Sequence, residues 1–578
     1  MVRFKVSGVR KNEKGAIGLK HSGKWLCVFI GLVLLLAGCG GQNGASGTDG
    51  PSAGPSEAAS ASASDASDQP GQNVVVTAFS SQGARITSFN DNLLTRKIEQ
   101  KLGIKIDFQT APSDGAKDKQ NLLLSSGDYP AAFIGGSFNK VDQLKYGKLG
   151  VLIPLNDLID QYAPNIKKAF EENPLLKKGV TAPDGNIYAL PGLDGCDHCM
   201  YPAKLWINEE WLKKVNLSLP TTTDEFAKVL AAFKNDDPNG NGKADEIPLS
   251  GYVETGNEWG NPVNFLMNAF IYTDPTNYLR VKDGKVDLVA DEPEWKQGLA
   301  YIRDLYAQKL IDPQTFTQNM SGIQQTAMNP DSIILGAYAN LWNGDVMTIF
   351  GEAEDQRWNQ YVAVPPLKGP GGAQYATYTE DRMPDAEFAI TNKATKEQQI
   401  AAIRIADYLF TEEGALDAFL GVNAWVKAKD GQLGINGKPA IFDTTPQSDD
   451  WDAPTNALWE NMFYYMSKDL YMGQAVSQDV NIQDGNETRL YRENQKYVGH
   501  EPPEAERLPD LFIDPNDAQT VSELSTVINN YVRQNEVQFI IGKKNLDKDW
   551  DDYVNGLKKS GLDQYLQIYQ KAYEANKQ

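Results

Sequence analysis

The sequence predicts an α/β protein with more than one lobe. About 500 residues follow Asn73, and the chain has the apolar content and the 10% aromatic residues of a globular protein. This length exceeds what a single hydrophobic core supports, because chains divide into domains beyond roughly 250–300 residues. The first part of the body alternates between strand and helix patterns, and the rest is richer in helix.

The alternation at the start of the body predicts a parallel sheet. Leu93, Leu94, Ile98 and Leu102 have helical spacing, whereas β-branched runs and apolar–polar alternation mark the strands on either side. Consecutive strand–helix–strand units imply right-handed crossovers, with helices on both faces of the sheet. The predicted order is a strand at Val74 to Phe79, a helix at Asn90 to Leu102, a strand at Ile104 to Phe108, a helix through Leu122 to Leu124, and a strand at Ala132 to Ile134.

Longer helical patterns follow. A threonine-rich entry, Pro220 to Thr223, precedes one of them, and a threonine cap satisfies the first amide donors of a helix. No repeat of 20 to 50 residues is present, which excludes solenoids and propellers. The predicted helical segments are Thr223 to Phe233, Pro293 to Lys309, Lys396 to Leu409, Thr520 to Ile541 and Trp550 to Ala575.

The amino-terminal segment has the pattern of an export signal. A basic start precedes the apolar run Trp25 to Leu36, which is too short to span a membrane as a helix. The tetrapeptide Leu36-Ala37-Gly38-Cys39 resembles the lipobox of bacterial lipoproteins. The resemblance implies cleavage after residue 38, a lipid on Cys39 and anchoring to the outer face of the cell membrane. An uncleaved anchor, and ordinary secretion with a chance cysteine, are the alternatives.

Net charge excludes some partners. The leader carries seven basic residues and one acidic residue, so its removal changes the formal charge from −21 to −27. Such an acidic protein repels phosphate backbones and anionic headgroups. We therefore expect no nucleic-acid partner, and a polyanionic ligand is disfavoured unless a local basic pocket overrides the net charge.

Residues 39–72 are predicted to be a disordered tether. This segment is rich in Gly, Ser, Ala and Asp, contains no basic residue, and lacks apolar side chains to bury. A flexible chain of this length has a root-mean-square span of roughly 30 Å. The folded body can therefore stand clear of the bilayer.

Several segments of the body resemble a known family. The chain is similar to the extracytoplasmic solute-binding proteins of ABC importers, in the carbohydrate-type group that includes maltose-binding-like and alginate-oligosaccharide-binding proteins. The resemblance covers nearly all of the chain after the tether, and it depends on the order and number of the segments. They are Leu122 to Pro130, Asp184 to Pro191, Leu205 to Leu212, Pro220 to Phe226, Asp283 to Val286, Phe388 to Asn392 and Ala406 to Gly414.

This resemblance implies a two-lobe fold of the type II periplasmic-binding-protein kind. Two α/β lobes are joined by a hinge of two or three crossovers, and the ligand cleft lies between them. The first lobe is expected at residues 73–190 and 386–450. The second lobe is expected at residues 191–385 and 451–578, with a helical carboxy-terminal section.

The resemblance also implies a mechanism without chemistry. An oligosaccharide or related solute bridges both lobes, shifts the equilibrium to the closed form, and passes to the permease subunits of an ABC importer. We expect a monomer. A sensor lipoprotein that signals to a membrane kinase, and a carbohydrate-active enzyme, are the alternatives.

Catalytic motifs are absent from the sequence. We find no nucleophile elbow, no phosphate-binding glycine loop and no metalloprotease helix, and His198 and His500 are the only histidines after the leader. Carboxylates are abundant, so the enzyme alternative depends on a glycosidase acid–base pair.

One loop has the spacing of a calcium site. Oxygen-bearing side chains occupy positions 1, 3, 5 and 9 from Asp237, and Gly242 stands at position 6, where a tight turn is required. Position 12 is Pro248, so the terminal glutamate of an EF-hand is missing. In the alginate-binding relatives this stretch resembles a bound-calcium loop; the alternative is an Asn/Gly-rich surface turn. The resemblance implies ligands at Asp237, Asn239, Asn241, the Lys243 carbonyl, Asp245 and Glu246, holding a structural calcium ion.

Cys196-Asp197-His198-Cys199 allows three interpretations. The two cysteines form a local disulfide, remain structural thiols, or belong to a redox or metal site. A closed zinc site needs four ligands, and after the leader the chain offers only one other histidine, His500, and no further cysteine besides the lipid-bearing Cys39. The strand-then-helix context of a thioredoxin-type motif is also missing.

Aromatic residues are the main candidates for sugar binding, because the apolar faces of sugar rings stack on indole and phenol rings. Trp342 follows an apolar strand-like run and precedes a glycine turn. This position resembles the one at which maltose-binding-like proteins carry an aromatic residue that stacks on the sugar; a position in the core is the alternative. Trp259 has polar neighbours and belongs either to the cleft wall or to the surface. Trp206 and Trp211 are expected in the core.

Further candidates lie at strand ends and crossovers. Gly135 and Ser137 follow the third predicted strand, where ligands bind in open α/β sheets; a plain turn is the alternative. Tyr378 and Arg382 lie near the expected crossover between the lobes and complete the set of predicted ligand-binding residues.

Overall fold

The computed structural model describes residues 74–577 except 255, 350–355, 380–382, 446–452 and 461–462. Cys39, the leader and the tether lie outside the described residues, as does Arg382. Within the described part of the chain, no helix combines the length and the apolar character needed to cross a bilayer.

The first lobe is built on a four-stranded sheet of order β2-β1-β3-β9. Strands β1 (Val75–Gln82), β2 (Lys105–Pro112) and β3 (Ala132–Phe138) are parallel, which confirms the prediction from the alternating segments. Strand β9 (Ala386–Ile390) joins the edge antiparallel to β3. The last strand therefore comes from a part of the chain about 250 residues downstream, as a two-lobe fold with crossovers requires.

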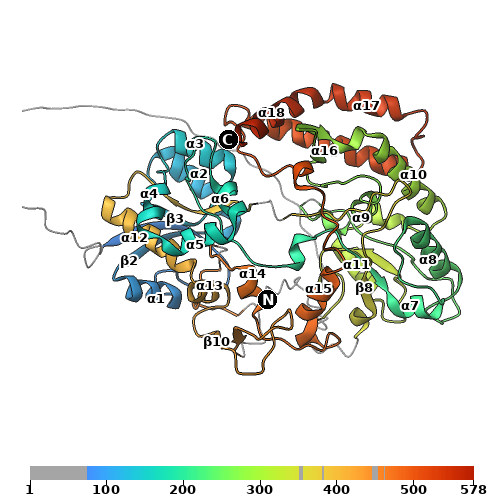
Figure 1. Ribbon diagram of the computed structural model, residues 1–578, viewed down its shortest axis with the longest axis horizontal. Helices are drawn as coiled ribbons and strands as arrows, with labels where there is room; N and C mark the ends of the chain where they lie inside the picture. The colour runs from blue at the N-terminus through green and yellow to red at the C-terminus, as the bar shows by residue number, and fades with distance from the viewer. Residues whose placement is uncertain are drawn as a thin grey trace, which may run out of the picture. The chain divides into compact units, whose positions relative to one another are not determined.

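Helices cover both faces of this sheet (Figure 1). Helices α1 (Leu93–Leu102) and α12 (Lys396–Leu409) share a core with Val76, Ala78 and Ile134 of the strands. Helices α2 (Ala116–Ser126) and α3 (Lys140–Lys148) share another with residues of the opposite strand face, including Phe79 and Phe133. The other elements of this lobe are α4 (Asn156–Tyr162), α5 (Pro164–Glu172), α6 (Pro174–Val180), α13 (Glu412–Phe419), β10 (Trp425–Lys427) and β11 (Phe442–Thr444).

The second lobe contains a three-stranded antiparallel sheet of order β7-β4-β8. Trp206 and Trp211 are buried in its core, as the sequence predicts. The strands are β4 (Leu205–Asn208), β7 (Ala337–Ala339) and β8 (Tyr361–Ala363). A separate antiparallel hairpin is formed by β5 (Leu279–Lys282) and β6 (Lys285–Leu288). The helices are α7 (Glu209–Lys214), α8 (Thr223–Asn235), α9 (Pro262–Met267), α10 (Pro293–Ala307) and α11 (Met320–Ala327).

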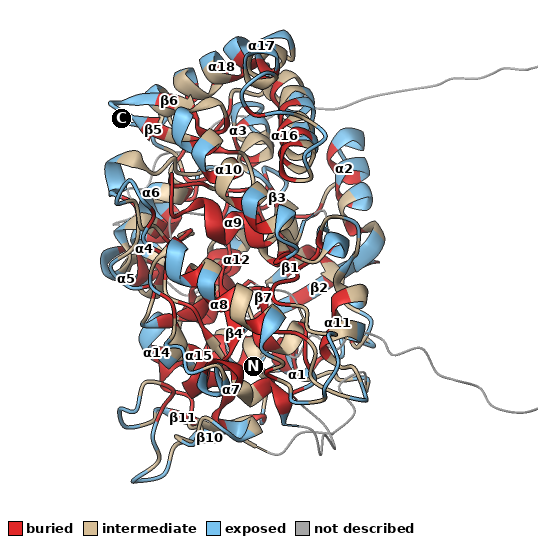
Figure 2. Ribbon diagram, turned by 90° about the vertical axis from the view of Figure 1, so that its right-hand side faces the viewer, coloured by how far each residue is buried: buried red, intermediate tan, exposed pale blue. Residues whose placement is uncertain are grey.

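Two helices of this lobe show how local sequence determines structure. The predicted threonine cap of α8 is Thr222, whose Oγ1 accepts from the Glu225 amide, and the Glu225 side chain completes a capping box. Helix α9 is buried along its whole length (Figure 2). Its rigid, enclosed position fixes the turn that precedes it, which carries Trp259.

The carboxy-terminal section consists of α14 (Lys468–Met472), α15 (Asn486–Asn494), α16 (Ala518–Ile540), α17 (Trp550–Lys559) and α18 (Leu562–Ala575). The last three helices belong to the core of the second lobe. The single helical segment predicted from Trp550 to Ala575 is wrong, because the chain breaks at Gly561, whose φ of 93° is incompatible with a right-handed helix.

One stretch of this section packs elsewhere. The Trp459 ring lies 6.3 Å from that of Phe89 and 5.3 Å from that of Phe108, and its Nε1 donates to Thr95 Oγ1 at 2.8 Å. Phe463 and α14 share the same core. Trp459 and residues 463–472, expected in the second lobe, therefore pack into the first.

Candidate ligand-binding site and calcium loop

Trp342 follows β7 and is half-buried against the core of the second lobe. Gly344 lies directly under its indole: a Cβ added at Gly344 would lie 2.4 Å from the Trp342 Cζ2 atom. The ring therefore takes its position because residue 344 has no side chain.

A polar network connects Trp342 to the segment of Trp259. The Asn340 Nδ2 donates to the Trp342 carbonyl at 2.8 Å and to Asp345 Oδ2 at 3.0 Å, while its Oδ1 accepts from the Tyr252 hydroxyl at 3.2 Å. The Tyr252 hydroxyl accepts from Asn257 Nδ2 at 2.8 Å. Burial raises the pKa of Asp345. The network places the segments of both predicted indoles in one region.

The turn of Trp259 is held from two sides. Trp259 is half-buried in the 3-10 helix Glu258–Gly260. The Gly260 carbonyl accepts from the Tyr252 amide at 2.9 Å, and Glu258 Oε1 accepts from Arg533 Nη2 of α16 at 2.8 Å. The carboxy-terminal section thus contacts the turn that carries this candidate.

Tyr378 belongs to an aromatic and cationic cluster. Its ring centroid lies 5.1 Å from that of Tyr201, and the Arg507 guanidinium carbon lies 5.1 Å from the ring on which it stacks. Its neighbour Thr377 accepts at Oγ1 from Asn268 Nδ2, at the end of α9, at 3.0 Å. Tyr378 therefore lies against Tyr201 and Arg507, and its neighbour Thr377 contacts the end of α9.

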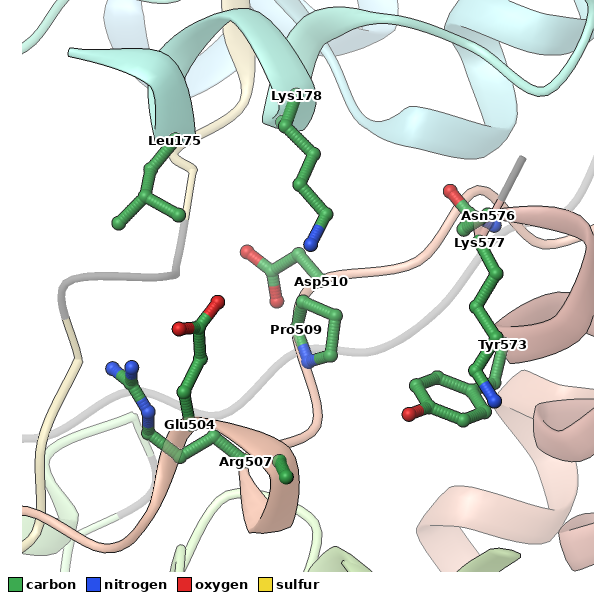
Figure 3. Close-up of a pocket in the computed structure, with 11 residues that line it drawn as sticks. Leu175, Lys178, Glu504, Arg507, Pro509, Asp510, Tyr573, Asn576 and Lys577 are labelled. Atoms are coloured by element: carbon green, nitrogen blue, oxygen red, sulfur yellow. The ribbon is translucent and has the colours of Figure 1, made fainter. Parts of the chain in front are cut away.

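Arg507 also lines a pocket of about 490 Å³ between the first lobe and the carboxy-terminal section. Figure 3 shows Lys178 extending from α6 toward Asp510, with Glu504 and Tyr573 contributed by the carboxy-terminal section. Charged side chains of both signs and a tyrosine ring are suited to bind sugar hydroxyls and a sugar face. The lining residues are Leu175, Lys178, Gly179, Glu504, Ala505, Arg507, Pro509, Asp510, Tyr573, Asn576 and Lys577.

Ser137 reaches this region through the crossover into β9. Its Oγ donates to Asp385 Oδ2 at 2.9 Å. Two residues before Asp385, the Met383 amide donates to Asp510 Oδ2, in the pocket lining, at 2.8 Å. Gly135 is buried inside β3, where the pairing with β9 shifts in register. Of the two first-lobe candidates, Ser137 is therefore the one connected to the pocket.

Several residues of this region are missing from the sequence prediction: Tyr252, Asn340, Asp345, Lys178, Arg507 and Asp510. None of them belongs to a motif. The aromatic residue Tyr252 and its partner Asn340 are 88 positions apart, and only the fold brings them together.

The predicted calcium loop folds tightly around its own oxygen atoms. Asp237 accepts from the amides of Asn241 and Gly242 at 3.1 and 3.0 Å. Gly240 and Gly242 have φ values of 73° and 72°, which side chains rarely permit. Asp245 accepts from the side-chain amides of Asn239 and Asn241 at 2.9 and 3.1 Å.

The environment of the Glu246 carboxyl indicates whether this loop fits a cation. Its Oε1 is buried without a hydrogen-bond partner among the described residues. Burial raises the pKa of Glu246, and the carboxylates of Asp237 and Asp245 raise it further. A hard divalent cation would neutralise this repulsion and satisfy the buried oxygen, so the residues present fit calcium.

Cys196 and Cys199 are joined by a disulfide. Cys196 belongs to the core of the first lobe, and the bridge closes the turn that leads into the 3-10 helix His198–Met200 and on to the second lobe. The two sulfur atoms and a His198 nitrogen lie within 4.8 Å of one another. In the disulfide form no thiolate is available to a metal, so the structure corresponds to the first of the three interpretations.

Comparison with known proteins defines the class. Residues 88–416 match the family of bacterial extracellular solute-binding proteins. The match spans more than half of the chain, and the chain belongs to this family. It is accordingly an extracytoplasmic protein of the type II binding-protein fold, with two lobes and a hinge.

Particular relatives share most of its length. The fructooligosaccharide ABC transporter substrate-binding protein FusA of Streptococcus pneumoniae is 32% identical over 84% of this chain and 88% of its own. The structure of FusA in complex with kestose has a TM-score of 0.61 at 30% identity, covering 86% of this chain and 99% of that one. An EF-hand mutant of FusA in complex with fructo-nystose has a TM-score of 0.60.

A more distant relative supports the fold. An extracellular solute-binding protein from Bifidobacterium longum subsp. infantis has a TM-score of 0.70 at 22% identity, covering 88% of this chain and 99% of that one. The arrangement of two lobes is therefore shared at lower sequence identity.

Proposed function

We propose that this protein captures an oligosaccharide outside the cell and delivers it to the permease of an ABC importer. The supporting observation is the 32% identity to FusA over 84% of this chain. The half-buried aromatic residues Trp342, Trp259 and Tyr378, and the mixed-charge pocket lined by Arg507, have the chemistry that sugars require. We further propose that Cys39 carries a lipid that holds the protein at the membrane surface.

The geometry suggests how binding drives closure. Lys178 and Gly179 belong to the first lobe, whereas Arg507 and Tyr573 belong to the carboxy-terminal section that packs on the second. A sugar in this pocket contacts both sides only when they approach, so its binding free energy favours the closed form. The indoles stack on sugar faces, and Asp345, which Asn340 holds beside Trp342, accepts hydrogen bonds from sugar hydroxyls.

We also propose a structural calcium ion in the loop 237–246. Asp237, Asn239, Asn241, the Lys243 carbonyl, Asp245 and Glu246 would hold it. The existence of an EF-hand mutant of FusA supports a comparable loop in that relative. When bound, calcium supplies positive charge that offsets the three carboxylates and fixes the turn after α8.

Calorimetric titration of the full chain in detergent with kestose and nystose tests the ligand. We expect saturable binding, and a sugar at 100 times its dissociation constant stabilises the fold by about 2.7 kcal/mol. Trp342→Ala should weaken binding about tenfold or more, whereas Trp425→Phe, a conservative change in the β10 hairpin, should not. Equal affinities for the two variants would contradict the site.

The same samples test the absence of turnover. Mass spectrometry of the sugar after long incubation with stoichiometric protein should recover it unchanged. A hydrolysed or rearranged sugar would instead make the protein a carbohydrate-active enzyme.

A further inference from the structure

Helix α16 contacts the Trp259 turn with two charged side chains one helical turn apart. Arg533 Nη2 donates to Glu258 Oε1 at 2.8 Å and to the Pro275 carbonyl at 3.4 Å. Glu536 Oε1 accepts from Asn261 Nδ2 in a long contact of 3.5 Å. Residues three apart face the same side of a helix, so both side chains reach the same turn, one before Trp259 and one after it.

Asn261 transmits the second contact to α9. Its Oδ1 accepts from the Val263 amide at 3.1 Å and caps the helix. Because Nδ2 donates to Glu536, the amide has only one orientation in which Oδ1 can act as the cap. Glu536 therefore fixes the point where the Trp259 turn joins the buried helix α9.

Glu536 is an unusual residue for a purely structural contact. It is 3% exposed, and its Oε2 has no hydrogen-bond partner among the described residues. A buried carboxyl with an unsatisfied oxygen costs stability, and a glutamine would make the contact to Asn261 without a charge. The position of this group points to a role other than holding the fold.

We propose that Arg533 and Glu536 are positioning residues that hold the Trp259 turn in its ligand-binding shape, and that Glu536 makes this shape depend on pH. The inference rests on the proposed function, in which Trp259 contacts the oligosaccharide. The ligand is still an oligosaccharide, and the inference adds that Arg533 and Glu536 position the Trp259 indole that contacts it.

The charged and titratable groups around Glu536 determine whether the Trp259 turn is held more firmly at low or at high pH. Arg533 on α16 favours the ionised form of Glu536. Tyr278 before β5 and Tyr553 on α17 face Glu536 from the other elements packed against it. Glu258 is ion-paired with the same Arg533. Burial raises the pKa of Glu536 to about 7. Above that pH the carboxylate competes with Glu258 for Arg533, so the ion pair that holds the turn weakens.

The decisive experiment follows the turn with and without ligand. The difference in fluorescence between the full chain and its Trp259→Phe variant isolates the Trp259 emission, and we expect a transition near pH 7 without sugar. In Glu536→Gln this transition should disappear. Over the same range, pH 5.5 to 8.5, the dissociation constant for kestose should rise about fivefold in the parent and stay constant in Glu536→Gln.

Arg533 provides the matched pair of variants. Arg533→Met should weaken kestose binding at every pH, and Arg533→Lys should retain part of the affinity because it keeps the positive charge. Thermal unfolding of both variants shows whether the weaker binding comes from a loss of folding. If kestose binds nowhere in this range, the proposed ligand is wrong while the fluorescence transition still tests the positioning role. A Trp259 emission independent of pH, or a transition unchanged in Glu536→Gln, would overturn the inference.

Discussion

At the residue scale, the position of the Trp342 ring depends on the absence of a Cβ atom at Gly344. Gly344 has a negative φ, so alanine would be tolerated by the backbone, but its Cβ would lie 2.4 Å from the indole. The ring would have to move away from Asn340 and Asp345. One methyl group at residue 344 is therefore enough to displace the Trp342 ring.

Gly344→Ala should consequently weaken kestose binding about tenfold, equivalent to about 1.4 kcal/mol, with little change in overall stability. Titration calorimetry measures the affinity. Gly371→Ala is the matched control, because a Cβ there would meet no atom within 4 Å. An unchanged affinity in Gly344→Ala would show that the indole does not contact the sugar.

Glu536 leads to a prediction about stability as well as binding. Its pKa is raised from 4.5 to about 7 by burial, so the unfolded chain ionises at a lower pH than the folded one. Stability is therefore fully retained below pH 4.5, declines as pH rises to 7, and is lower by about 3 kcal/mol above that. Glu536→Gln should remove this loss, with urea unfolding showing equal stabilities at pH 4.5 and a more stable variant at pH 8. Parallel pH profiles for both proteins would contradict the buried charge.

At this scale the sequence singled out some residues of the candidate site and missed others for a physical reason. Trp342 and Trp259 stand beside polar residues and glycines, which is a local property and can be recognised. Tyr252, Asn340 and Arg533 have no such pattern, because their roles come from partners such as Glu258, 275 positions away from Arg533. Contacts of this kind follow only from the fold.

At the element scale, periodic segments were predictable and their interruptions were not. The order of β1, α1, β2, α2 and β3 follows from hydrophobic spacing, and α12 matches its predicted bounds. The break between α17 and α18 depends on Gly561 taking a φ of 93°, with the Leu524 side chain packed against it. A glycine within an otherwise helical pattern does not reveal this by itself.

The calcium loop is the element with the sharpest prediction. Glu246→Gln should act with opposite signs in the two states of the loop. Without calcium it removes repulsion with Asp237 and Asp245, and the melting temperature should rise slightly. With calcium it removes an anionic ligand, and calcium affinity should fall about tenfold or more.

Calorimetry after chelation, and again at millimolar calcium, measures both effects. Asp128→Asn, at an exposed site of the first lobe, controls for the loss of one negative charge. A Glu246→Gln variant that binds calcium as tightly as the parent would remove Glu246 from the ligand set.

At the scale of the whole molecule, the carboxy-terminal section contacts both lobes. Helices α16 to α18 belong to the second-lobe core, whereas Phe512 is buried with residues of the first. Lys140 Nζ donates to the carbonyls of Gly179 and Asp510 at 2.7 and 3.1 Å and lies 4.6 Å from the Phe512 ring centroid. Burial lowers the pKa of Lys140 to about 8. Sequence length predicted two lobes, but not that the last 70 residues connect them, because Phe512 has no distinguishing pattern.

Phe512→Ala should therefore loosen the connection between the lobes. Truncation of a buried phenylalanine costs about 3–5 kcal/mol, and here part of that loss appears as easier separation of the carboxy-terminal section from the first lobe. Small-angle scattering of the sugar-free variant should give a larger radius of gyration than the parent, and saturating kestose should reduce the difference because the ligand supplies new contacts to both sides. Leu149→Ala, which removes a first-lobe side chain that is 66% exposed, should scatter like the parent. If Phe512→Ala and Leu149→Ala gave the same radius without sugar, the segment 507–514 would not connect the lobes, and closure would depend on the hinge alone.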